Sequence, residues 1–154
     1  MKYWLMKSEP DVFGINDLMK RPKKTEHWDG IRNYQARNMI RDEMQKGDQA
    51  FFYHSNAKQI GIVGIMSICR EAYPDYTAFD PDSKYYDPKS NPDNPRWFMI
   101  DVKHVRKFKN IITLDTLKQH ADQLGDIALL KRGNRLSINP VTKKQWDYIL
   151  KLEQ

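Results

Sequence analysis

Apolar and polar positions alternate in several short stretches of the chain, and turn-forming residues separate these stretches. Such alternation, combined with β-branched and aromatic residues, is typical of strands. Four strands are predicted at residues 2–6 (KYWLM), 49–54 (QAFFYH), 59–69 (QIGIVGIMSIC) and 96–108 (RWFMIDVKHVRKF), and a brief fifth within 134–141 (NRLSINPV). Gly61 and Gly64 inside the third stretch predict a bulge or a tight bend where the sheet curls.

The strongest helical signal covers residues 33–47 (NYQARNMIRDEMQKG). Ala36, Ile40 and Met44 recur there every four residues, as on the buried face of a helix. Asn33 is expected to cap the start of this helix, because Asn side chains accept hydrogen bonds from the first free backbone amides.

Shorter helices complete the pattern at residues 14–20, 113–120 and 142–152. The last of them opens with a capping box from Thr142 to Gln145. Short strands and helices are interspersed, without an internal repeat or a linker. The sequence therefore predicts a single α+β domain over residues 1–154, built around a small barrel-like sheet.

A long loop rich in Pro, Asp and Tyr is predicted at residues 73–95. Loops of this length inside a compact domain are usually functional or disordered. Tyr85 and Tyr86 favour packing against the domain, because disordered tracts are poor in aromatic residues.

Charge, cysteine content and apolar runs indicate which partners and which location to expect. The net charge of +6 favours a polyanionic partner, although a solvated basic surface is the alternative. Cys69 is the only cysteine, so no internal disulfide forms, and a reducing, cytoplasmic location is expected. No apolar run approaches the roughly 20 residues that span a bilayer, and no zinc-ligand spacing is present. We therefore expect no membrane partner and no metal.

Catalytic pairs are the next possibility. His27 and Asp29 flank Trp28, and His54 adjoins Ser55, so acid–base or nucleophile–base pairs are conceivable. Neighbours in a strand point to opposite faces, however, which separates the His54 and Ser55 side chains. No nucleophile elbow, phosphate loop or metal spacing appears. We expect neither an enzyme nor a cofactor.

The four tryptophans divide into two groups. Trp4 lies inside a predicted strand and Trp146 on the apolar face of a predicted helix, so both are expected in the core. Trp28 and Trp97 lie at loop–strand junctions, where each can cap a hydrophobic edge or line a site. Together with Tyr53 at a strand end, they favour one concave site whose rings stack on a nucleobase, an interaction worth roughly 1–3 kcal/mol per base.

Seven sequence blocks resemble one known family. The blocks are WLMKSEP (4–10), WDGIRNYQARN (28–38), FYHSN (52–56), YPD (73–75), DPKS (87–90), PRW (95–97) and RLSINPV (135–141). In this order and spacing they resemble the EVE domain family over essentially the whole chain. The resemblance implies a PUA-like fold, a small β-pseudo-barrel of about five to six mostly antiparallel strands with peripheral helices, related to PUA, ASCH and YTH domains.

The resemblance also implies a function. EVE domains are implicated in recognising modified bases, notably 5-methylcytosine and 5-hydroxymethylcytosine, in an aromatic pocket. A non-catalytic module of this kind would bind DNA or RNA, and a partner enzyme that acts on the nucleic acid is not indicated by the sequence. The matching motifs place these residues in the base-binding pocket: Lys7, Ser8, Trp28, Asn33, Tyr34, Tyr53, His54, Ser55, Asn56, Trp97, Arg135 and Ser137.

Phosphate contacts are expected from two basic segments. Residues 131–144 hold five Lys or Arg and no acid, and Arg37 and Arg41 share one face of the predicted helix. We expect Arg37, Arg41, Lys131 and Arg132 to contact phosphates, which position a strand without reading its sequence.

Two other function classes remain open. One is a small-molecule or protein-binding module on the same fold, whose affinity would fall little with salt. The other is a nucleic-acid-processing enzyme, which would show a pH-dependent rate that disappears when His54 or His27 is removed.

Overall fold

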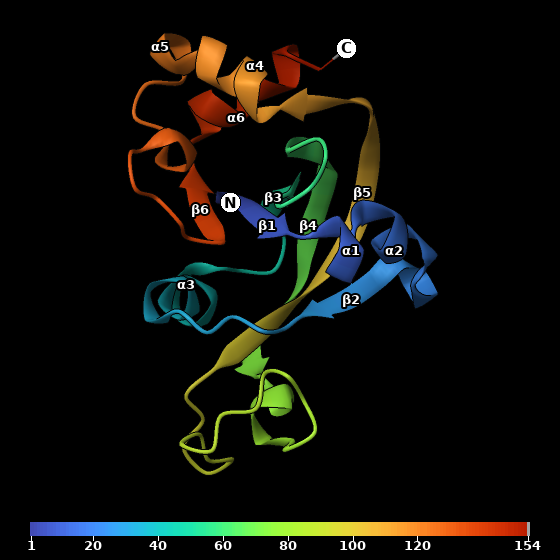
Figure 1. Ribbon diagram of the computed structural model, residues 1–154, viewed down its shortest axis with the longest axis vertical. Helices are drawn as coiled ribbons and strands as arrows, with labels where there is room; N and C mark the ends of the chain where they lie inside the picture. The colour runs from blue at the N-terminus through green and yellow to red at the C-terminus, as the bar shows by residue number, and fades with distance from the viewer. Residues whose placement is uncertain (154) are drawn as a thin grey trace.

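A six-stranded sheet organises the chain in this computed structural model, which describes residues 1–153 (Figure 1). The strands are β1 (Tyr3–Ser8), β2 (Thr25–Trp28), β3 (Gln49–His54), β4 (Gly61–Pro74), β5 (Phe98–Thr113) and β6 (Ile138–Val141). Their order is β2-β5-β4-β3-β1-β6. The β1–β3 pair is parallel and the others are antiparallel. The prediction of an α+β fold with a small, mostly antiparallel sheet is confirmed.

The sheet curls but does not close, because its edge strands β2 and β6 do not pair with each other. Curling is produced by register shifts between the two longest strands, β4 and β5. One shift lies between Ile62 and Gly64, where a bend is predicted from the glycines. A Cβ atom on Gly64 would lie 2.5 Å from the carbonyl oxygen of Arg106 on β5, so only glycine permits this close strand approach.

Within residues 1–153, six α-helices lie around the sheet. They are α1 (Pro10–Phe13), α2 (Ile15–Lys20), α3 (Tyr34–Asn38), α4 (Leu114–Gln119), α5 (Ala121–Leu124) and α6 (Lys143–Lys151). Short 3-10 turns cover Pro22–Lys24, Tyr76–Phe79 and Ala128–Leu130. The capping box at the start of α6 is confirmed, since Thr142 and Gln145 each bond the other's backbone amide.

The helix predicted over residues 33–47 is shorter than expected. Asn33 caps α3 as predicted, accepting from the Ala36 amide at 3.0 Å. The helix then widens into a π-helical turn at Met39–Glu43 and ends there. Met44 is still buried, so the apolar spacing indicated burial correctly but not the helix end.

The core consists of two clusters on the two faces of the sheet. One contains Trp4, Trp28 and Phe52, beside α2 and α3. The other contains Tyr53 and Trp146 and lies beneath α4, α5 and α6, at the top of Figure 1. Trp4 and Trp146 are 1% and 3% exposed, which confirms their predicted place in the core. Because side chains alternate along β3, Phe52 and Tyr53 belong to different clusters.

Other parts of the chain also differ from the sequence prediction. Residues 25–28 (TEHW) form the edge strand β2, paired with β5, although their polar side chains show no strand-like alternation. Strand β5 also continues to Thr113, beyond the predicted end at residue 108. The long loop forms its own lobe at the bottom of Figure 1. Within residues 1–153, no helix has both the length and the apolar character needed to cross a membrane.

Candidate functional site

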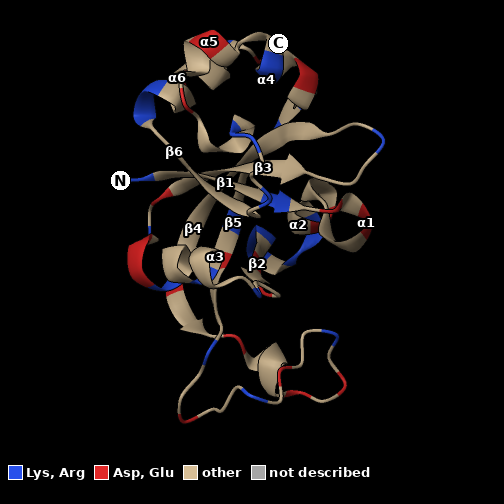
Figure 2. Cartoon of the chain, turned by 60° about the vertical axis from the view of Figure 1, so that its left-hand side comes forward, with Lys and Arg blue, Asp and Glu red and all other residues tan. Residues whose placement is uncertain are grey.

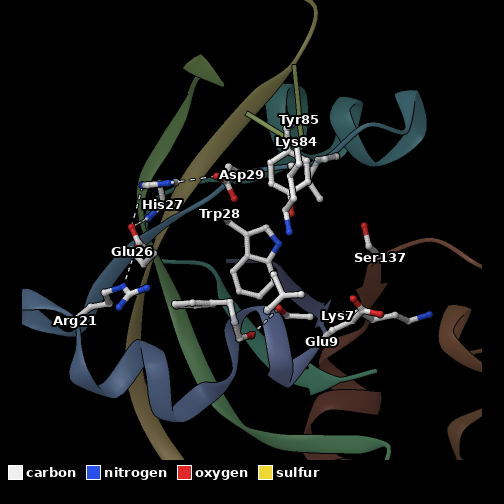
Figure 3. Close-up of a pocket in the computed structure, with 15 residues that line it drawn as sticks. Lys7, Glu9, Arg21, Glu26, His27, Trp28, Asp29, Lys84, Tyr85 and Ser137 are labelled. Atoms are coloured by element: carbon white, nitrogen blue, oxygen red, sulfur yellow. Dashed lines mark hydrogen bonds and ion pairs between the residues drawn. The ribbon is translucent and has the colours of Figure 1, made fainter. Parts of the chain in front are cut away.

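A cavity of about 450 Å³ lies at the opening of the sheet (Figure 3). Both edges contribute to it: β2 supplies one wall, while the end of β1 and Ser137, just before β6, supply the other. Helix α1 and the tip of the long loop complete the lining. The lining residues are Lys7, Ser8, Glu9, Val12, Phe13, Arg21, Glu26, His27, Trp28, Asp29, Gly30, Ile31, Lys84, Tyr85 and Ser137.

Trp28 is at the centre of the lining residues drawn in Figure 3. Its indole meets the rings of Phe13 and Phe52 edge-on, with centroid distances of 6.3 and 5.4 Å. These contacts fix the indole and leave it only 6% exposed, with its nitrogen-bearing edge toward the side where Lys84 and Ser137 lie. Trp28 therefore belongs both to the core and to the cavity wall.

Tyr85 forms the wall above Trp28 in Figure 3 and comes from the long loop. Its ring packs directly on the backbone of Gly30, where an added Cβ atom would lie 2.5 Å from Cζ of the tyrosine. Gly30 also has a φ of +78°, a backbone conformation that is unfavourable for residues with a Cβ atom. Residue 30 must therefore be glycine for Tyr85 to lie where it does.

Arg32 and Asp75 hold the loop in place. Arg32 donates two hydrogen bonds to the Tyr85 carbonyl oxygen, at 2.7 and 3.1 Å, and one to Asp75 at 3.0 Å. Asp75 is fully buried and also accepts from the Gly30 amide at 2.9 Å. The Arg32–Asp75 pair thus ties the end of β2 to the loop that carries Tyr85.

The contact between Gly30 and Tyr85 gives a first prediction. Gly30→Ala should displace the Tyr85 ring and weaken binding of whatever ligand occupies the cavity, because the new Cβ atom enters the space of that ring. Gly47→Ala is the matched control: its φ is +97°, and no atom lies within 4 Å of the added Cβ. Both variants should lose stability, by roughly 1–3 kcal/mol from backbone strain, in urea unfolding. Equal ligand affinity in the two variants would contradict the assigned role of Tyr85.

One side of the cavity is rich in hydrogen-bond acceptors. Strand β2 supplies Glu26 and His27, and Asp29 follows directly after the last residue of the strand. His27 Nδ1 lies 2.9 Å from Glu26 Oε1, and its Nε2 lies 3.5 Å from Asp29 Oδ2. Burial, reinforced by the negative charges of Asp75 and Glu26, raises the pKa of Asp29, while His27 opposes this shift.

The opposite side carries Lys7, Ser8 and Ser137. The Lys7 amide donates to the Ser137 carbonyl oxygen at 2.8 Å, which joins the end of β1 to the start of β6. Burial lowers the pKa of Lys7. Within residues 1–153 no carboxylate forms an ion pair with Lys7. The Ser8 hydroxyl donates to the Phe13 carbonyl oxygen at 2.6 Å, which holds α1 against the cavity.

The predicted site residues divide between two neighbouring hollows. Lys7, Ser8, Trp28 and Ser137 line the cavity described above. A second hollow of about 580 Å³ contains Asn33, Lys131, Arg132 and Arg135. The two hollows draw on the same two segments, residues 31–33 and 135–137, so they lie next to each other. The second hollow is called the basic groove below; it is lined by Asn33, Gln35, Met39, Ala128, residues 131–136 and Pro140.

The expectation that Trp28, Tyr53 and Trp97 converge in one concave site is wrong. Tyr53 is buried in the cluster on the other face of the sheet, with its pKa raised to about 12 by burial. Trp97 is 6% exposed, stacks on Tyr34 at 4.9 Å and donates to Asp87 at 2.7 Å. Only Trp28 lines the cavity.

The residues that follow Tyr53 also face elsewhere. His54 Nε2 accepts from the Ile15 amide at 3.2 Å, and burial lowers the pKa of His54. The Ser55 amide donates to the Ser8 carbonyl oxygen. Asn56 donates to Glu9 at 2.6 Å, beside a separate hollow next to α1. These three residues connect the end of β3 to the end of β1, to Glu9 and to α2, and none of them lines the cavity.

Arg37 and Arg41, two of the four residues expected to contact phosphates, have partners within the protein. Arg37 donates to the Arg96 carbonyl oxygen at 2.8 Å and lies over the Tyr34 ring. Arg41 bonds both carboxylate oxygens of Asp42, at 2.7 and 2.9 Å, on an exposed surface. Neither arginine lines the cavity or the basic groove.

Sequence reasoning missed Phe13, Gly30 and Tyr85 as lining residues, and it considered Asp29 only as part of a catalytic pair. The block WDGIRNYQARN contains Asp29 and Gly30, so their positions next to Trp28 were a usable signal. Tyr85 was noticed only as a packing residue of the loop. In the part of the chain that the structure describes, no group of three or more His, Cys, Asp or Glu is placed to hold a metal ion.

Comparison with known proteins shows the family. The EVE domain family matches residues 2–152. Thymocyte nuclear protein 1 of Rattus norvegicus is 48% identical over 168 residues, which cover 99% of this chain and 74% of the relative. A crystal structure of human THYN1 protein in complex with 5-methylcytosine containing DNA is 46% identical, with a TM-score of 0.95 and coverage of 100% of this chain and 98% of that one.

A bacterial structure gives the same result. A protein from Pseudomonas syringae is 50% identical, with a TM-score of 0.92, and the match covers 97% of this chain and 98% of that one. These similarities extend over essentially all residues, and the six-stranded open sheet is the PUA-like fold of the same structures. The chain belongs to the EVE domain family.

Proposed function

We propose that this protein binds nucleic acid containing a modified base of the 5-methylcytosine type and holds that base in the cavity beside Trp28. The observation that carries the proposal is the cavity itself, which opens between the sheet edges and has aromatic walls from Trp28 and Tyr85. The human relative, nearly identical in fold, was crystallised with 5-methylcytosine containing DNA.

The dimensions and lining of the cavity suit a single base. Its volume of about 450 Å³ falls in the usual range of small-ligand sites, roughly 300–1,000 Å³. Extracting a base from its stack costs a few kcal/mol. Stacking on aromatic side chains contributes about 1–3 kcal/mol per base, which offsets much of this cost.

The basic groove supplies the contacts to the nucleic-acid backbone. Lys131, Arg132 and Arg135 are exposed there and lie next to the base cavity. Their positive charges would attract phosphates on either side of the bound base. Arg41 is expected to contribute little to binding, because a phosphate would have to replace the two hydrogen bonds that Arg41 donates to Asp42. In Figure 2 both basic and acidic positions are coloured along the long loop at the bottom of the picture.

The proposal assigns recognition and no reaction to this chain. His54 accepts a backbone hydrogen bond and does not face Ser55 as a base would. His27 is held between two carboxylates, which suits a structural link within the site. A recognition module of this kind requires a partner that acts on the marked nucleic acid. The cytoplasmic location expected from the lone Cys69 is part of the same proposal.

Tyr85→Ala tests the proposal without disturbing the core. The variant should weaken binding to a short oligonucleotide with one 5-methylcytosine by about 1–3 kcal/mol, because one stacking surface is lost. Fluorescence anisotropy titrations of the labelled oligonucleotide measure the change. Tyr86→Ala is the control, since Tyr86 is the next residue of the loop and is exposed at 42%.

Salt dependence provides the second arm of this experiment. Affinity should fall as salt rises for modified and unmodified oligonucleotides alike, with a smaller slope when Lys131 and Arg132 are both replaced by alanine. If Tyr85→Ala and Tyr86→Ala bind the modified oligonucleotide equally well, the base does not occupy this cavity.

A further inference from the structure

We infer that Asp29 selects the class of base, by accepting a hydrogen bond from the exocyclic amine of a cytosine-type base and excluding thymine-type bases. The inference rests on the proposed function and adds to it the group that reads the edge of the base. It follows from the position of Asp29, from the lack of a close donor to its carboxylate within residues 1–153, and from the position of Ser137 across the cavity.

Asp29 follows Trp28 directly at the end of β2, and its side chain lines the cavity at 30% exposure. In residues 1–153, the groups that act on its carboxylate as donors are His27, at 3.5 Å, and its own backbone amide. A carboxylate offers about four acceptor positions, so acceptor capacity remains for a ligand.

A chain of polar contacts from Arg21 through Glu26 and His27 fixes the orientation of this carboxylate (Figure 3). Arg21 Nε lies 2.6 Å from Glu26 Oε2, and the other oxygen of Glu26 lies 2.9 Å from His27 Nδ1. Nε2 of His27 then points at Asp29. The histidine ring is held from one side by Glu26 and supports Asp29 from the other.

The ionised form of Asp29 is less favoured in this cavity than in free solution. Burial raises the pKa of Asp29, and the neighbouring charges of Asp75 and Glu26 act in the same direction. A hydrogen-bond donor that approaches Asp29 would stabilise its ionised form. A ligand that brings an amine would satisfy this group.

A donor lies across the cavity from Asp29. Ser137 is on the far side of the Trp28 ring in Figure 3, and its side chain carries a hydroxyl group. The Lys7 ammonium points away from the cavity and lies 5.8 Å from the centre of the Tyr53 ring. A base lying against Trp28 would thus meet an acceptor on one side and the Ser137 hydroxyl on the other.

This arrangement matches cytosine and not thymine. Cytosine presents an exocyclic amine as a donor, whereas thymine presents a carbonyl oxygen at the equivalent position. Thymine carries a methyl group at the same carbon as 5-methylcytosine, so the two bases differ mainly in this hydrogen-bonding edge. Opposite thymine, the Asp29 carboxylate would face an oxygen and remain unpaired, which disfavours binding.

The test compares oligonucleotides that are identical except for one central position, occupied by 5-methylcytosine, thymine or an abasic site. The parent protein should prefer 5-methylcytosine over thymine by roughly 5- to 150-fold, the range expected for a well-placed polar pair. Asp29→Asn should bring this ratio close to one, because the amide can turn its NH₂ group toward the thymine oxygen.

Two further variants complete the design. Asp29→Ser has neither the carboxylate of the parent nor the amide of Asp29→Asn. It should therefore lose the discrimination between 5-methylcytosine and thymine, and it provides the test if Asp29→Asn folds poorly. Asp126→Asn is the matched control, at an exposed position outside both hollows, and should keep the parent's ratio. Thermal denaturation should show Asp29→Asn to be at least as stable as the parent, because a disfavoured carboxylate is removed.

The outcomes separate the inference from the proposed function. A parent that binds 5-methylcytosine no better than the abasic site overturns the proposed function, and the inference with it. A parent that prefers 5-methylcytosine over thymine, with the same ratio in Asp29→Asn and Asp29→Ser, overturns only the role of Asp29. Loss of the ratio in Asp29→Asn and Asp29→Ser, with Asp126→Asn unchanged, supports the inference.

Discussion

Replacing Trp28 with alanine is expected to abolish detectable binding to 5-methylcytosine oligonucleotides and to lower the free energy of unfolding by about 3–5 kcal/mol. Both effects arise because one indole serves two purposes. It is 6% exposed and braced by Phe13 and Phe52, and it is also the central wall of the cavity. Urea unfolding measures the first effect and anisotropy titration the second.

A second tryptophan separates the two effects. Trp146 is 3% exposed and stacks on Phe51, in the core cluster on the far face of the sheet. Trp146→Ala should destabilise the protein to a similar extent and leave affinity unchanged at temperatures where the variant is folded. Trp28→Phe, which keeps an aromatic wall, should bind more weakly than the parent but retain the fold. If Trp28→Ala loses no more affinity than Trp146→Ala, the indole is only a core residue.

Replacing Arg32 with alanine is expected to cost about 3–5 kcal/mol of stability, since the buried Asp75 carboxylate would lose its charged partner. Asp75 is fully buried, and Arg32 also supplies both hydrogen bonds to the Tyr85 carbonyl oxygen. The loop should therefore loosen as well. Urea unfolding measures the stability, and hydrogen exchange of residues 75–87 measures the loop.

Arg41→Ala is the control for this substitution. Its ion pair with Asp42 is exposed, and such pairs contribute about 0–1 kcal/mol. The double variant Arg32→Ala/Asp75→Ala should recover part of the lost stability, because no uncompensated charge is left buried. A loss below 1 kcal/mol in Arg32→Ala, with loop exchange unchanged, would show that the pair does not hold the loop.

Local signals in the sequence predicted much of the fold. Alternation identified β1, β3 and β4 because each has one or both faces in a core cluster, and the capping box located the start of α6. Strand β2 was missed because it is an edge strand of four residues whose polar side chains face a cavity. The π-helical turn at Met39–Glu43 was missed because the apolar spacing that buries Met44 also suits a regular helix.

The candidate site was harder to predict than the fold. Strand alternation shows that Phe52 and Tyr53 face opposite sides, but it does not show which side holds the cavity. Tyr85 reaches the site through contacts of Arg32 and Asp75 that join residues 43 to 53 positions apart in the chain. No local pattern reports such contacts. The base-binding and phosphate-binding roles, and the single domain over residues 1–154, stay predictions.

Photocrosslinking tests the central claim, that the modified base occupies the cavity beside Trp28, most directly. An oligonucleotide with one 5-iodocytosine in place of 5-methylcytosine carries a photoreactive atom where the methyl group would lie. After irradiation of the complex, mass spectrometry of the digested protein identifies the crosslinked residue. We expect crosslinks at Phe13, Trp28 or Tyr85, the rings that line the cavity. Crosslinks confined to the basic groove or to the α4–α6 face would contradict the account.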